Sequence, residues 1–221
     1  MCGRYNFIFN ATMQSLFSEL GVTASLANQF NITPTESVAI IIESQKHYEC
    51  HLARWWLTPS WSNGPDQHYS MFNARAENLE HSRAFKGPFH HKRCIIPATS
   101  FIEWQETDNG KQPYEIFRSE RQPIVFAGLW DCWNDEIISC VIVTTQAAKS
   151  MQTIHQRMPV MLNTPGVEQW LNPDTEIASL NNFMAELQPY PLQAQAVDRA
   201  INNPRAKVLP KPIGNIIYLA P

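Results

Sequence analysis

The first residues of the chain, Met1-Cys2-Gly3-Arg4, carry the most reactive group that the sequence offers. Cysteine is small enough for the initiator Met1 to be removed, which would leave Cys2 as the amino terminus. A free α-amine has a pKa of about 7.7–8.0 against about 10.4 for lysine, so far more of it is neutral and nucleophilic near neutral pH. With the adjacent thiol it forms a 1,2-aminothiol, which captures an aldehyde because the amine makes an imine and the thiol then closes a thiazolidine. The alternative is an ordinary start codon before a buried thiol.

Residues Phe72–Glu77 alternate between apolar and polar side chains. As a strand, this segment directs Asn73, Arg75 and Glu77 to one face and the apolar side chains to the core. An amide, a guanidinium and a carboxylate on one face suit an anionic substrate and a positioned nucleophile. The other interpretation is a strand whose exposed polar face is paired with itself.

Two more stretches place titratable side chains among apolar ones. Glu103 and Trp104 follow the apolar strand Cys94–Pro97, and burial of Glu103 would raise its pKa towards neutrality, as an acid–base catalyst needs. Trp104 could stack on a nucleobase or a sugar, or belong to the core. His155 and Arg157 would share a face if extended, which puts a group that titrates near neutrality beside a fixed positive charge. For Glu103 and His155 a purely structural role is the alternative.

Short elements must position these side chains. The apolar stripe of residues 10–21 predicts a first helix, capped by Asn10 or Thr12 and ended by Gly21, and a second helix is expected near residues 175–187. Strands follow strands between them, which favours a mostly antiparallel α+β domain over alternating βαβ units. The expected strands are Val38–Ile42, Leu52–Leu57, Tyr114–Arg118, Ile124–Trp130 and Ile137–Thr144.

Length and composition exclude several classes of protein. With 221 residues, 44% of them hydrophobic and 17% charged, the chain fits one folded domain better than a disordered chain. No apolar run is long enough for a transmembrane helix, and the amino terminus lacks the pattern of a secretory signal. Five cysteines without a CxxC pair argue against a disulfide framework and for a reducing, cytosolic compartment.

The net charge of −3 argues against a generally basic nucleic-acid binder. Residues 51–100 nevertheless hold six Lys/Arg and three Asp/Glu, hence +3, which leaves −6 for the rest. This segment is either a local anion-binding face or an ordinary solvated one. His90, His91 and Cys94 are close in sequence, but their spacing is not that of a zinc site and a fourth ligand is not evident, so we expect no metal.

Four stretches together resemble the SOS-response-associated peptidase (SRAP) family in their order and spacing. They are Met1-Cys2-Gly3-Arg4, Asn73-Ala74-Arg75-Ala76-Glu77, Phe101-Ile102-Glu103-Trp104 and His155-Gln156-Arg157-Met158-Pro159. Secondary matches are Asn31–Thr35, Leu57–Trp61, Phe126–Trp130, Val143–Thr145 and the ending Ala200–Asn203. The resemblance covers nearly the whole chain, so we expect a single domain over residues 1–221.

The resemblance implies a sensor and shield of abasic sites in single-stranded DNA. In this family Met1 is removed autocatalytically, Cys2 then crosslinks the ring-opened deoxyribose aldehyde as a thiazolidine, and lyase chemistry at the abasic site is open to the protein. The implied fold is a set of mainly antiparallel, bifurcated sheets curled into a pseudo-barrel with peripheral helices. We expect no cofactor, no metal and no membrane, and a cytoplasmic monomer whose partner is single-stranded DNA with an abasic site.

The resemblance also implies roles for single residues. Cys2 would be the crosslinking nucleophile, and Asn73 would orient its amine. Glu103 would act as acid and base, and His155 would pass a proton to the sugar oxygens. The residues implied in DNA binding are Arg4, Arg75, Arg83 and Arg157 for phosphates, with Trp104 and Pro34 for nucleotides.

The chain departs from the family pattern at three positions. Ser100 and Ile102 stand where the family usually has Gly and Tyr, and Trp56 stands where it usually has Gly. The first two could shift Glu103, and Trp56 could reshape a wall of the DNA groove.

Two other functions stay open from the residues alone. One is an N-terminal-nucleophile or cysteine hydrolase that uses Cys2, His155 and Asn73. The other is a noncatalytic single-stranded nucleic-acid binding module that uses arginine and tryptophan side chains.

Overall fold

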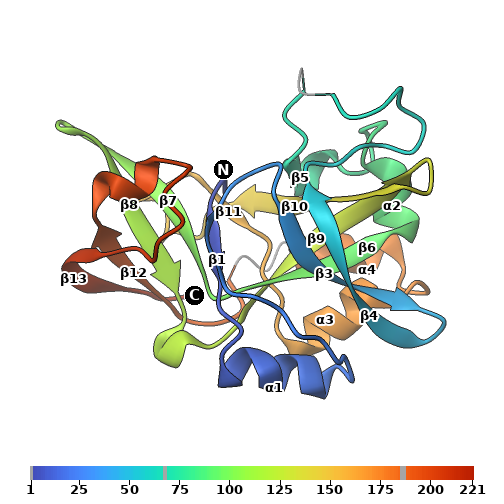
Figure 1. Ribbon diagram of the computed structural model, residues 1–221, viewed down its shortest axis with the longest axis horizontal. Helices are drawn as coiled ribbons and strands as arrows, with labels where there is room; N and C mark the ends of the chain where they lie inside the picture. Colours follow the sequence, from blue (N-terminus) through green and yellow to red (C-terminus); the bar gives the residue numbers. More distant parts are fainter. Residues whose placement is uncertain (1, 67–68, 185–187) are drawn as a thin grey trace.

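One group of strands closes into a ring. In the computed structural model, which describes residues 2–66, 69–184 and 188–221, strand β10 pairs with β4 on one edge and with β9 on the other. Because β4 pairs with β3, β3 with β6 and β6 with β9, the path returns to its start (Figure 1). The β4–β10 pair is parallel, and the other pairs of the ring are antiparallel. The ring strands are β3 (Ser37–Ser44), β4 (His47–Trp55), β6 (Arg93–Ala98), β9 (Ile124–Trp133) and β10 (Ile137–Gln146).

A second sheet is open and lies beside the ring, with the amino terminus between the two (Figure 1). Its strand order is β13-β12-β8-β7-β1-β2, and all of its pairs are antiparallel. Its strands are β1 (Tyr5–Phe7), β2 (Gln29–Ile32), β7 (Ser100–Thr107), β8 (Gly110–Phe117), β12 (Leu192–Val197) and β13 (Pro212–Leu219).

The two sheets share one core, and that core anchors the amino-terminal strand. Tyr5 of β1 is buried, and its ring meets Trp55 edge-on at 5.2 Å and Phe126 at 6.0 Å. Edge-to-face contacts between aromatic rings add to the free energy gained by burying them. Since Trp55 and Phe126 belong to the ring, this contact fixes β1, and with it Cys2, against the ring.

The sheets fork at two places near the amino terminus. β6 and β7 are separated by Thr99 alone, so the chain passes from the ring into the open sheet there, and Thr99 donates two hydrogen bonds to the Asn6 carbonyl oxygen. Along β10, residues 137–142 pair with β9 and residues 144–146 with β11 (Arg157–Pro159). On its other edge, β4 gives way to β5 (Asn73–Arg75). Asn73 lies on β5, Glu103 on β7 and Arg157 on β11, so these polar residues belong to the segments that diverge at the forks.

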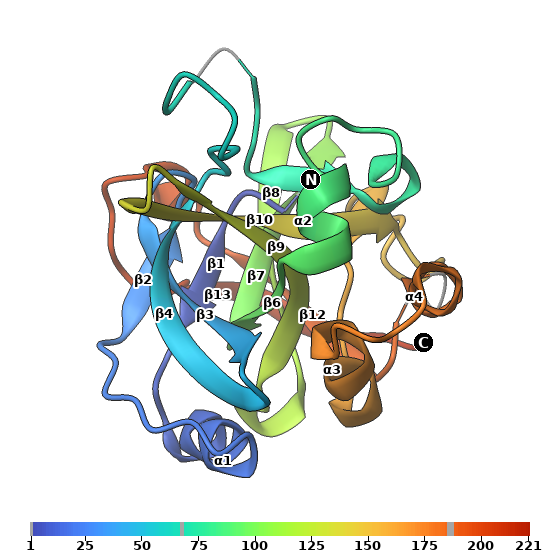
Figure 2. The ribbon, with the colours of Figure 1, turned by 90° about the vertical axis from the view of Figure 1, so that its right-hand side faces the viewer.

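Helices cover the outside of the sheets (Figure 2). The first begins after Asn10, whose side chain accepts a hydrogen bond from Met13 N, and the chain leaves it at Gly21, where φ is +67° and glycine is favoured. The helices are α1 (Ala11–Glu19), α2 (Lys86–His91), α3 (Thr164–Leu171) and α4 (Ile177–Met184), with 3₁₀ helices η1 (Ala76–Asn78), η2 (Ser119–Arg121) and η3 (Arg199–Asn202). Within the described ranges, no helix has the length and apolar character needed to cross a membrane.

The predicted fold class is confirmed: the protein is α+β, with mainly antiparallel sheets, a ring and few helices. Each expected strand overlaps an observed one, and α4 lies inside the expected helix 175–187, whose residues 185–187 fall outside the described part of the chain. The prediction that Phe72–Glu77 forms one strand is wrong. The strand ends at Arg75 and η1 follows, because this turn carries Leu79 into the core, where it is fully buried.

Candidate functional site

A groove of about 740 Å³ opens between the two sheets beside the amino terminus. Five parts of the chain build it: the segment after the amino terminus, Phe72 before β5, the β7–β8 hairpin, the turn before β11 and η3. Its lining includes Gly3, Phe72, Glu103, Trp104, His155 and Asn202. The sequence-predicted residues Glu103, Trp104 and His155 therefore share one cavity, with Cys2 next to the lining residue Gly3.

Asn73 and Cys2 are in direct contact, and each is next in sequence to a residue of the groove lining, Phe72 and Gly3. The side-chain Nδ2 of Asn73 donates a hydrogen bond of 2.8 Å to the Cys2 carbonyl oxygen, and both residues are buried. The parallel pairing of β5 with β10, in which Asn73 lies opposite Ile142, sets the position of this amide. Among the described residues, Asn73 Oδ1 has no hydrogen-bond partner. A buried amide oxygen without a partner costs free energy, so its position beside Cys2 indicates a functional site.

Glu103 of β7 is a buried carboxyl group, 1% exposed. Its expected burial is confirmed, and this burial raises the pKa of Glu103 to about 7. The Cys2 thiol interacts electrostatically with this carboxylate. Burial raises the pKa of Cys2, and the negative charge of Glu103 raises it further. We call the buried residues Cys2, Asn73 and Glu103 the floor of the groove. In this floor the thiol is protonated at neutral pH, and Glu103 exchanges its proton near neutral pH.

His155 faces Glu103 across the groove, with its Nε2 4.0 Å from Oε2 of Glu103. Burial lowers the pKa of His155, and the positive charges of Lys111 and Arg157 lower it further. The two shifts have opposite directions, so near pH 7 the site can hold a protonated carboxyl group beside a neutral imidazole. Such a pair supplies an acid and a base at the same pH.

His155 and Arg157 do not share a face, contrary to the sequence-based expectation. His155 ends a turn before β11, and its Nδ1 accepts a hydrogen bond of 3.0 Å from the Arg157 backbone N–H. The Arg157 guanidinium turns to the other side, where it donates to Glu77 at 2.6 Å and to the Thr144 carbonyl oxygen at 2.8 Å. The tight turn, closed by that hydrogen bond, is what separates the two side chains.

Arg75 and Arg157 meet near one carboxylate. The pKa of Glu77 is lowered. Burial acts in the opposite direction, but the hydrogen bond from Arg157 lowers this pKa, and the positive charge of Arg75 lowers it further. Arg75 itself is exposed at the end of β5. The structure thus brings Arg75, Glu77 and Arg157 together, as a charged cluster rather than along one strand face.

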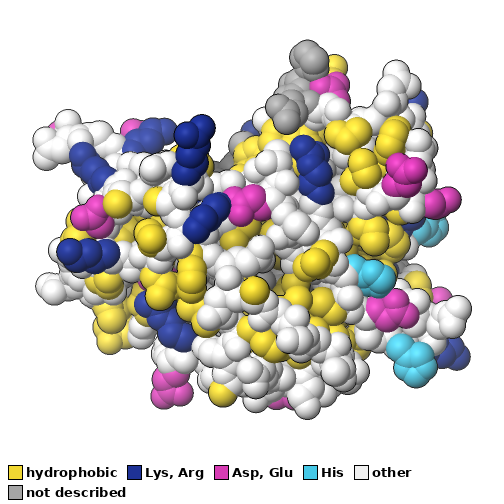
Figure 3. Space-filling view, in the orientation of Figure 1, with side chains coloured by type: hydrophobic (Ala, Val, Ile, Leu, Met, Phe, Trp, Pro, Cys, Tyr) yellow, Lys and Arg dark blue, Asp and Glu magenta, His cyan; other side chains and the backbone are white. Residues whose placement is uncertain are grey.

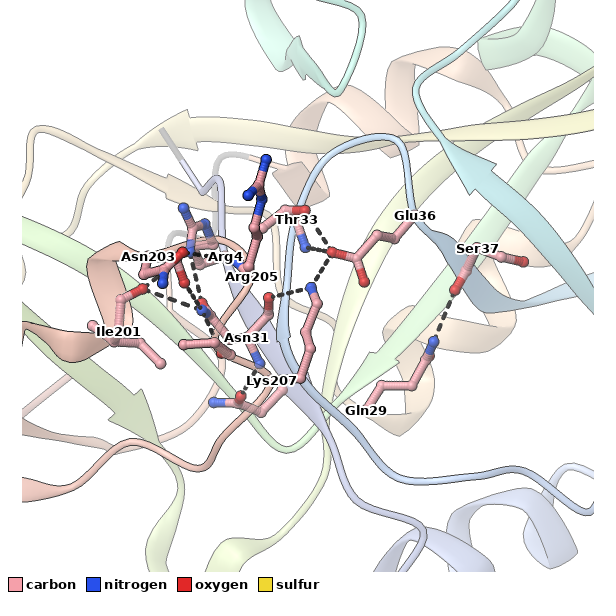
Figure 4. A network of polar contacts seen from close by, with 12 residues as sticks. Arg4, Gln29, Asn31, Thr33, Glu36, Ser37, Ile201, Asn203, Arg205 and Lys207 are labelled. Carbon is pink, nitrogen blue, oxygen red and sulfur yellow. Dashed lines mark hydrogen bonds and ion pairs between the residues drawn. The ribbon is translucent and has the colours of Figure 1, made fainter.

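Arg4 is held by the carboxyl-terminal part of the chain (Figure 4). Its Nη1 donates to Asn31 Oδ1 at 2.8 Å and to the Ile201 carbonyl oxygen at 3.1 Å. Its guanidinium lies 5.9 Å from the ring centroid of Trp104, and Trp104 Nε1 donates to Asn202 Oδ1 at 2.7 Å. Arg4 and Trp104, predicted separately from the sequence, are therefore neighbours, and Trp104 lines the groove.

Of the predicted DNA-binding residues only Trp104 is in the groove lining, and within the described part of the chain Arg83 and Pro34 also lack the contacts that join the others to the site. Arg83 is exposed and stacks on Trp61 at 4.0 Å, and Pro34 is half-buried in the turn between β2 and β3. The positive charge of residues 51–100 does not form one face either. Arg93 is buried and donates to backbone carbonyl oxygens, and Lys92 pairs with Asp131.

Sequence reasoning missed several groove residues. Lys111 enters from the β7–β8 hairpin, and residues 152–154 enter from the turn before His155. No pattern in the neighbouring sequence distinguishes these residues, because a polar residue in a hairpin resembles any solvated loop residue. Asn202 lay within the quoted ending Ala200–Asn203, so a signal for it was present.

In the described ranges, no three His, Cys, Asp or Glu side chains are close enough to hold a metal ion. His90 instead pairs with Glu80 at 3.0 Å, and Cys94 is buried in the core.

Comparison with known proteins identifies the family of this chain. A sequence model of the SOS response associated peptidase (SRAP) family matches residues 1–204. The chain belongs to the SRAP family. The residues that meet in the groove, from Cys2 to Asn202, all lie inside the matched range, whereas β13 lies beyond it.

Several SRAP relatives carry the same descriptive name. The abasic site processing protein YoqW of Bacillus subtilis is 32% identical over 219 residues, 93% of this chain and 96% of that protein. The abasic site processing protein YedK of Escherichia coli is 30% identical over 146 residues, 65% of this chain and 64% of that protein. The abasic site processing protein HMCES of Xenopus tropicalis is 30% identical over 179 residues, 65% of this chain and 53% of that protein.

Solved structures share the fold. A crystal structure of a protein from Bacteroides thetaiotaomicron superimposes with a TM-score of 0.74 at 23% identity, covering 88% of this chain and 91% of that one. One from Bordetella bronchiseptica gives 0.72 at 24% identity, covering 89% of this chain and all of that one.

The departures from the SRAP pattern have structural explanations. Ser100 accepts a hydrogen bond from Asn6 and donates one of 2.7 Å to the buried Glu115, so its hydroxyl completes a polar network. Ile102 packs with Ile201 and Trp104 beneath η3. Trp56 donates to the Asp66 carbonyl oxygen, and its ring lies 5.6 Å from that of Phe72, which lines the groove.

Proposed function

We propose that this protein processes abasic sites in single-stranded DNA by capturing the sugar aldehyde covalently through Cys2. The observation that carries the proposal is the contact of Asn73 with Cys2, next to the buried carboxyl of Glu103 in an open groove. The names of the SRAP relatives support the substrate. The chemistry rests on the side chains described here.

The first step is removal of Met1. Water adds to the carbonyl carbon of the Met1–Cys2 peptide bond, the C–N bond breaks, and free methionine leaves. Glu103, with a pKa of about 7, takes a proton from the water and returns one to the departing Cys2 nitrogen. The product is an α-amine on a residue whose carbonyl group is already held by Asn73.

The second step is capture of the aldehyde. The Cys2 amine adds to the aldehyde carbon, and loss of water leaves an imine. The thiol then adds to the same carbon, a C–S bond forms, and the thiol proton moves to nitrogen, which closes the thiazolidine. The Oδ1 of Asn73 is available to accept a hydrogen bond from the amine, Glu103 donates the proton that releases water, and His155 passes a proton to the sugar oxygen.

DNA contacts surround this centre. Arg4, Arg75, Arg83 and Arg157 would hold phosphates, and Trp104 and Pro34 would pack on nucleotides. Arg157 reaches a phosphate by leaving Glu77, an exchange of one anion for another that costs little at a partly exposed pair. The reaction needs neither metal nor cofactor, and we propose that the protein acts as a single-domain monomer in the cytoplasm.

The test is incubation of the protein with a single-stranded oligonucleotide that carries one abasic site, followed by a denaturing gel and intact-mass measurement. The proposal predicts a band that survives denaturation, with the mass of the chain lacking Met1 plus the DNA minus one water. A hydrolase would instead turn over an amide or ester, and a noncatalytic binding module would give a complex that denaturant dissolves. Either result without the covalent band would refute the proposal.

A further inference from the structure

The carboxyl-terminal part of the chain concentrates positive charge. From residue 199 to the end at residue 221 the basic residues are Arg199, Arg205, Lys207 and Lys211, and no Asp or Glu occurs. The chain as a whole has a net charge of −3. Figure 3 shows Lys and Arg side chains gathered over the part of the molecule formed by β8, η3 and β13. We call these four residues the C-terminal cationic surface.

This surface borders the groove. Asn202 of η3 lines the groove and accepts the hydrogen bond from Trp104. Arg199, at the other end of η3, donates through Nη2 to the Asn109 carbonyl oxygen at the tip of the β7–β8 hairpin. Lys111 of the same hairpin is in the groove lining. Lys111 is paired with Glu106, so the unpaired positive charges run from Arg199 of η3, beside the groove, to Lys211 just before β13.

Most of this charge is not neutralised by the protein itself. Among the described residues, Arg199, Arg205 and Lys211 have no carboxylate within ion-pair distance, whereas Lys207 pairs with Glu36. By contrast, Arg157 is bound by Glu77. Unpaired cations beside a cleft raise the local concentration of an anionic ligand.

The backbone that carries these residues is fixed in place (Figure 4). The Asn31 side chain donates to the carbonyl oxygens of Ile201, Asn203 and Ala206, from a backbone with φ of +48°, in the left-handed region. Lys207 returns a hydrogen bond of 3.1 Å to the Asn31 carbonyl oxygen. Ordering the surface on binding therefore costs little conformational entropy.

We propose that the C-terminal cationic surface holds the phosphates of a DNA single strand on one side of the lesion. This inference rests on the proposed function for the location of the lesion, and it adds a second set of phosphate contacts to those at Arg75 and Arg157. Single-stranded DNA is the occupant because the surface leads into the groove past Trp104, a half-buried aromatic ring in the groove lining on which an unpaired base can stack. Part of the surface, Arg205 to Lys211, lies beyond the range that the family model matches.

The first experiment measures binding of an undamaged single-stranded oligonucleotide against salt by fluorescence anisotropy. The double variant Arg199→Gln/Arg205→Gln is compared with Lys46→Gln/Lys86→Gln, which removes the same charge from exposed positions on the β3–β4 turn and α2. The slope of log affinity against log salt is negative, and each lost phosphate contact reduces its magnitude by roughly 0.7. The first pair should therefore reduce the magnitude by about 1.4, and the control pair should leave it unchanged. Equal slopes for the two double variants would overturn the proposal, and so would equal affinity of the wild type for duplex DNA.

The second experiment places the abasic site at the 5′ end or the 3′ end of the oligonucleotide, so that the strand extends to one side only. At limiting protein and moderate salt, the Arg199→Gln/Arg205→Gln variant should crosslink one of the two substrates several-fold less and the other as well as the wild type does. If the variant crosslinks both substrates less by the same factor, or both as well as the wild type does, the surface does not hold the strand on one side of the lesion. If the wild type fails to crosslink at all, the proposed function fails, while the salt slopes on undamaged DNA still test the surface.

Discussion

The floor and the walls of the groove differ in solvent exposure, and this difference separates chemistry from affinity. On the floor, Cys2 and Glu103 are almost completely buried, and their pKa values are shifted by that burial. On the walls, Lys111 and Arg199 are exposed, and interactions there are screened by water and salt. Changes to the floor should therefore alter reaction steps by large factors, and changes to the walls should alter binding by small ones.

The largest effect is expected at Cys2, where the amine and the thiol can be separated. In Cys2→Ala the α-amine survives removal of Met1, so an imine with the abasic aldehyde should form and borohydride should trap it. Without a thiol the ring cannot close, so the stable crosslink should be absent from a denaturing gel and the strand should break by β-elimination.

A retained residue before Cys2 should abolish both the imine and the crosslink, because the amine is then an amide. The control is the same chain with a cleavable extension, measured before and after cleavage. An uncleaved extension that still gave a stable crosslink would move the chemistry to another residue.

Glu103→Gln should slow crosslink formation by about 10²–10⁴, the usual contribution of a positioned acid or base. Because the pKa of Glu103 is raised to about 7, the wild-type pH–rate profile should bend near pH 7, and that bend should vanish in the variant. Glu19→Gln, at an exposed position of α1, is the control and should keep both rate and bend. Wild-type kinetics in Glu103→Gln would return this residue to a structural role.

His155→Ala should slow crosslink formation or reversal without reducing the affinity for undamaged single-stranded DNA. Its pKa is lowered by burial, so the neutral ring should act as a base even slightly below pH 6.5. His91→Ala, a change at an exposed histidine of α2, serves as the control. Single-turnover rates on a denaturing gel measure the effect, and equal rates for the two variants would contradict the proton-transfer role.

The same buried carboxyl makes stability depend on pH. The pKa of Glu103 is higher in the folded chain than its ordinary value of 4.5, so the folded state binds the proton more tightly. Stability must then fall as pH rises from about 4.5 to about 7, by up to about 3 kcal/mol. Denaturant unfolding of Glu103→Gln across this range should lack that decrease, and identical slopes for variant and wild type would show that Glu103 is not desolvated.

The smallest effects are expected on the wall, at the pair of Arg157 and Glu77. Glu77→Gln releases Arg157 for a phosphate and should raise affinity for single-stranded DNA about two- to fivefold, since a partly exposed ion pair contributes up to about 1 kcal/mol. Arg157→Gln should lower the affinity by a similar factor, and both should leave the crosslink rate at saturation unchanged. A drop in affinity with Glu77→Gln would mean that the pair is needed as a unit.

Strands could be predicted where a short segment consists mainly of apolar and β-branched residues. Ile124–Trp130 and Ile137–Thr144 are apolar and β-branched, and both became ring strands. Helix α1 followed from its cap and its apolar stripe. Helix α2 was missed because six residues that include Gly87 and Pro88 show no helical period. The start of helix α3 carries a signal in the sequence, because Asn163 caps it and Pro165 stands in its first turn.

The site was predictable as residue types, and less so as geometry. Glu103 and Asn73 were selected from their local patterns, and both proved to be buried. The strand face assigned to Asn73, Arg75 and Glu77 was wrong, because the strand ends at Arg75. The turn that follows lets Leu79 be buried in the core, and an alternating pattern of apolar and polar residues does not indicate such a turn. The carboxyl-terminal cations were overlooked because nothing in their sequence says that they return to the amino terminus.

The sequence by itself determined which functional groups are available: an aminothiol after removal of one residue, an amide, a carboxyl, an imidazole and several guanidinium groups. It also determined membership of the SRAP family, because motif order and spacing are properties of the chain. The tertiary structure decided which groups meet. Asn73 reaches Cys2 across 71 positions of sequence through the β5–β10 pairing, and Arg4 is held by Ile201 across 197. The pKa values of Glu103 and His155 were decided there too, because desolvation depends on the atoms that surround a group in space and not on its neighbours in the chain.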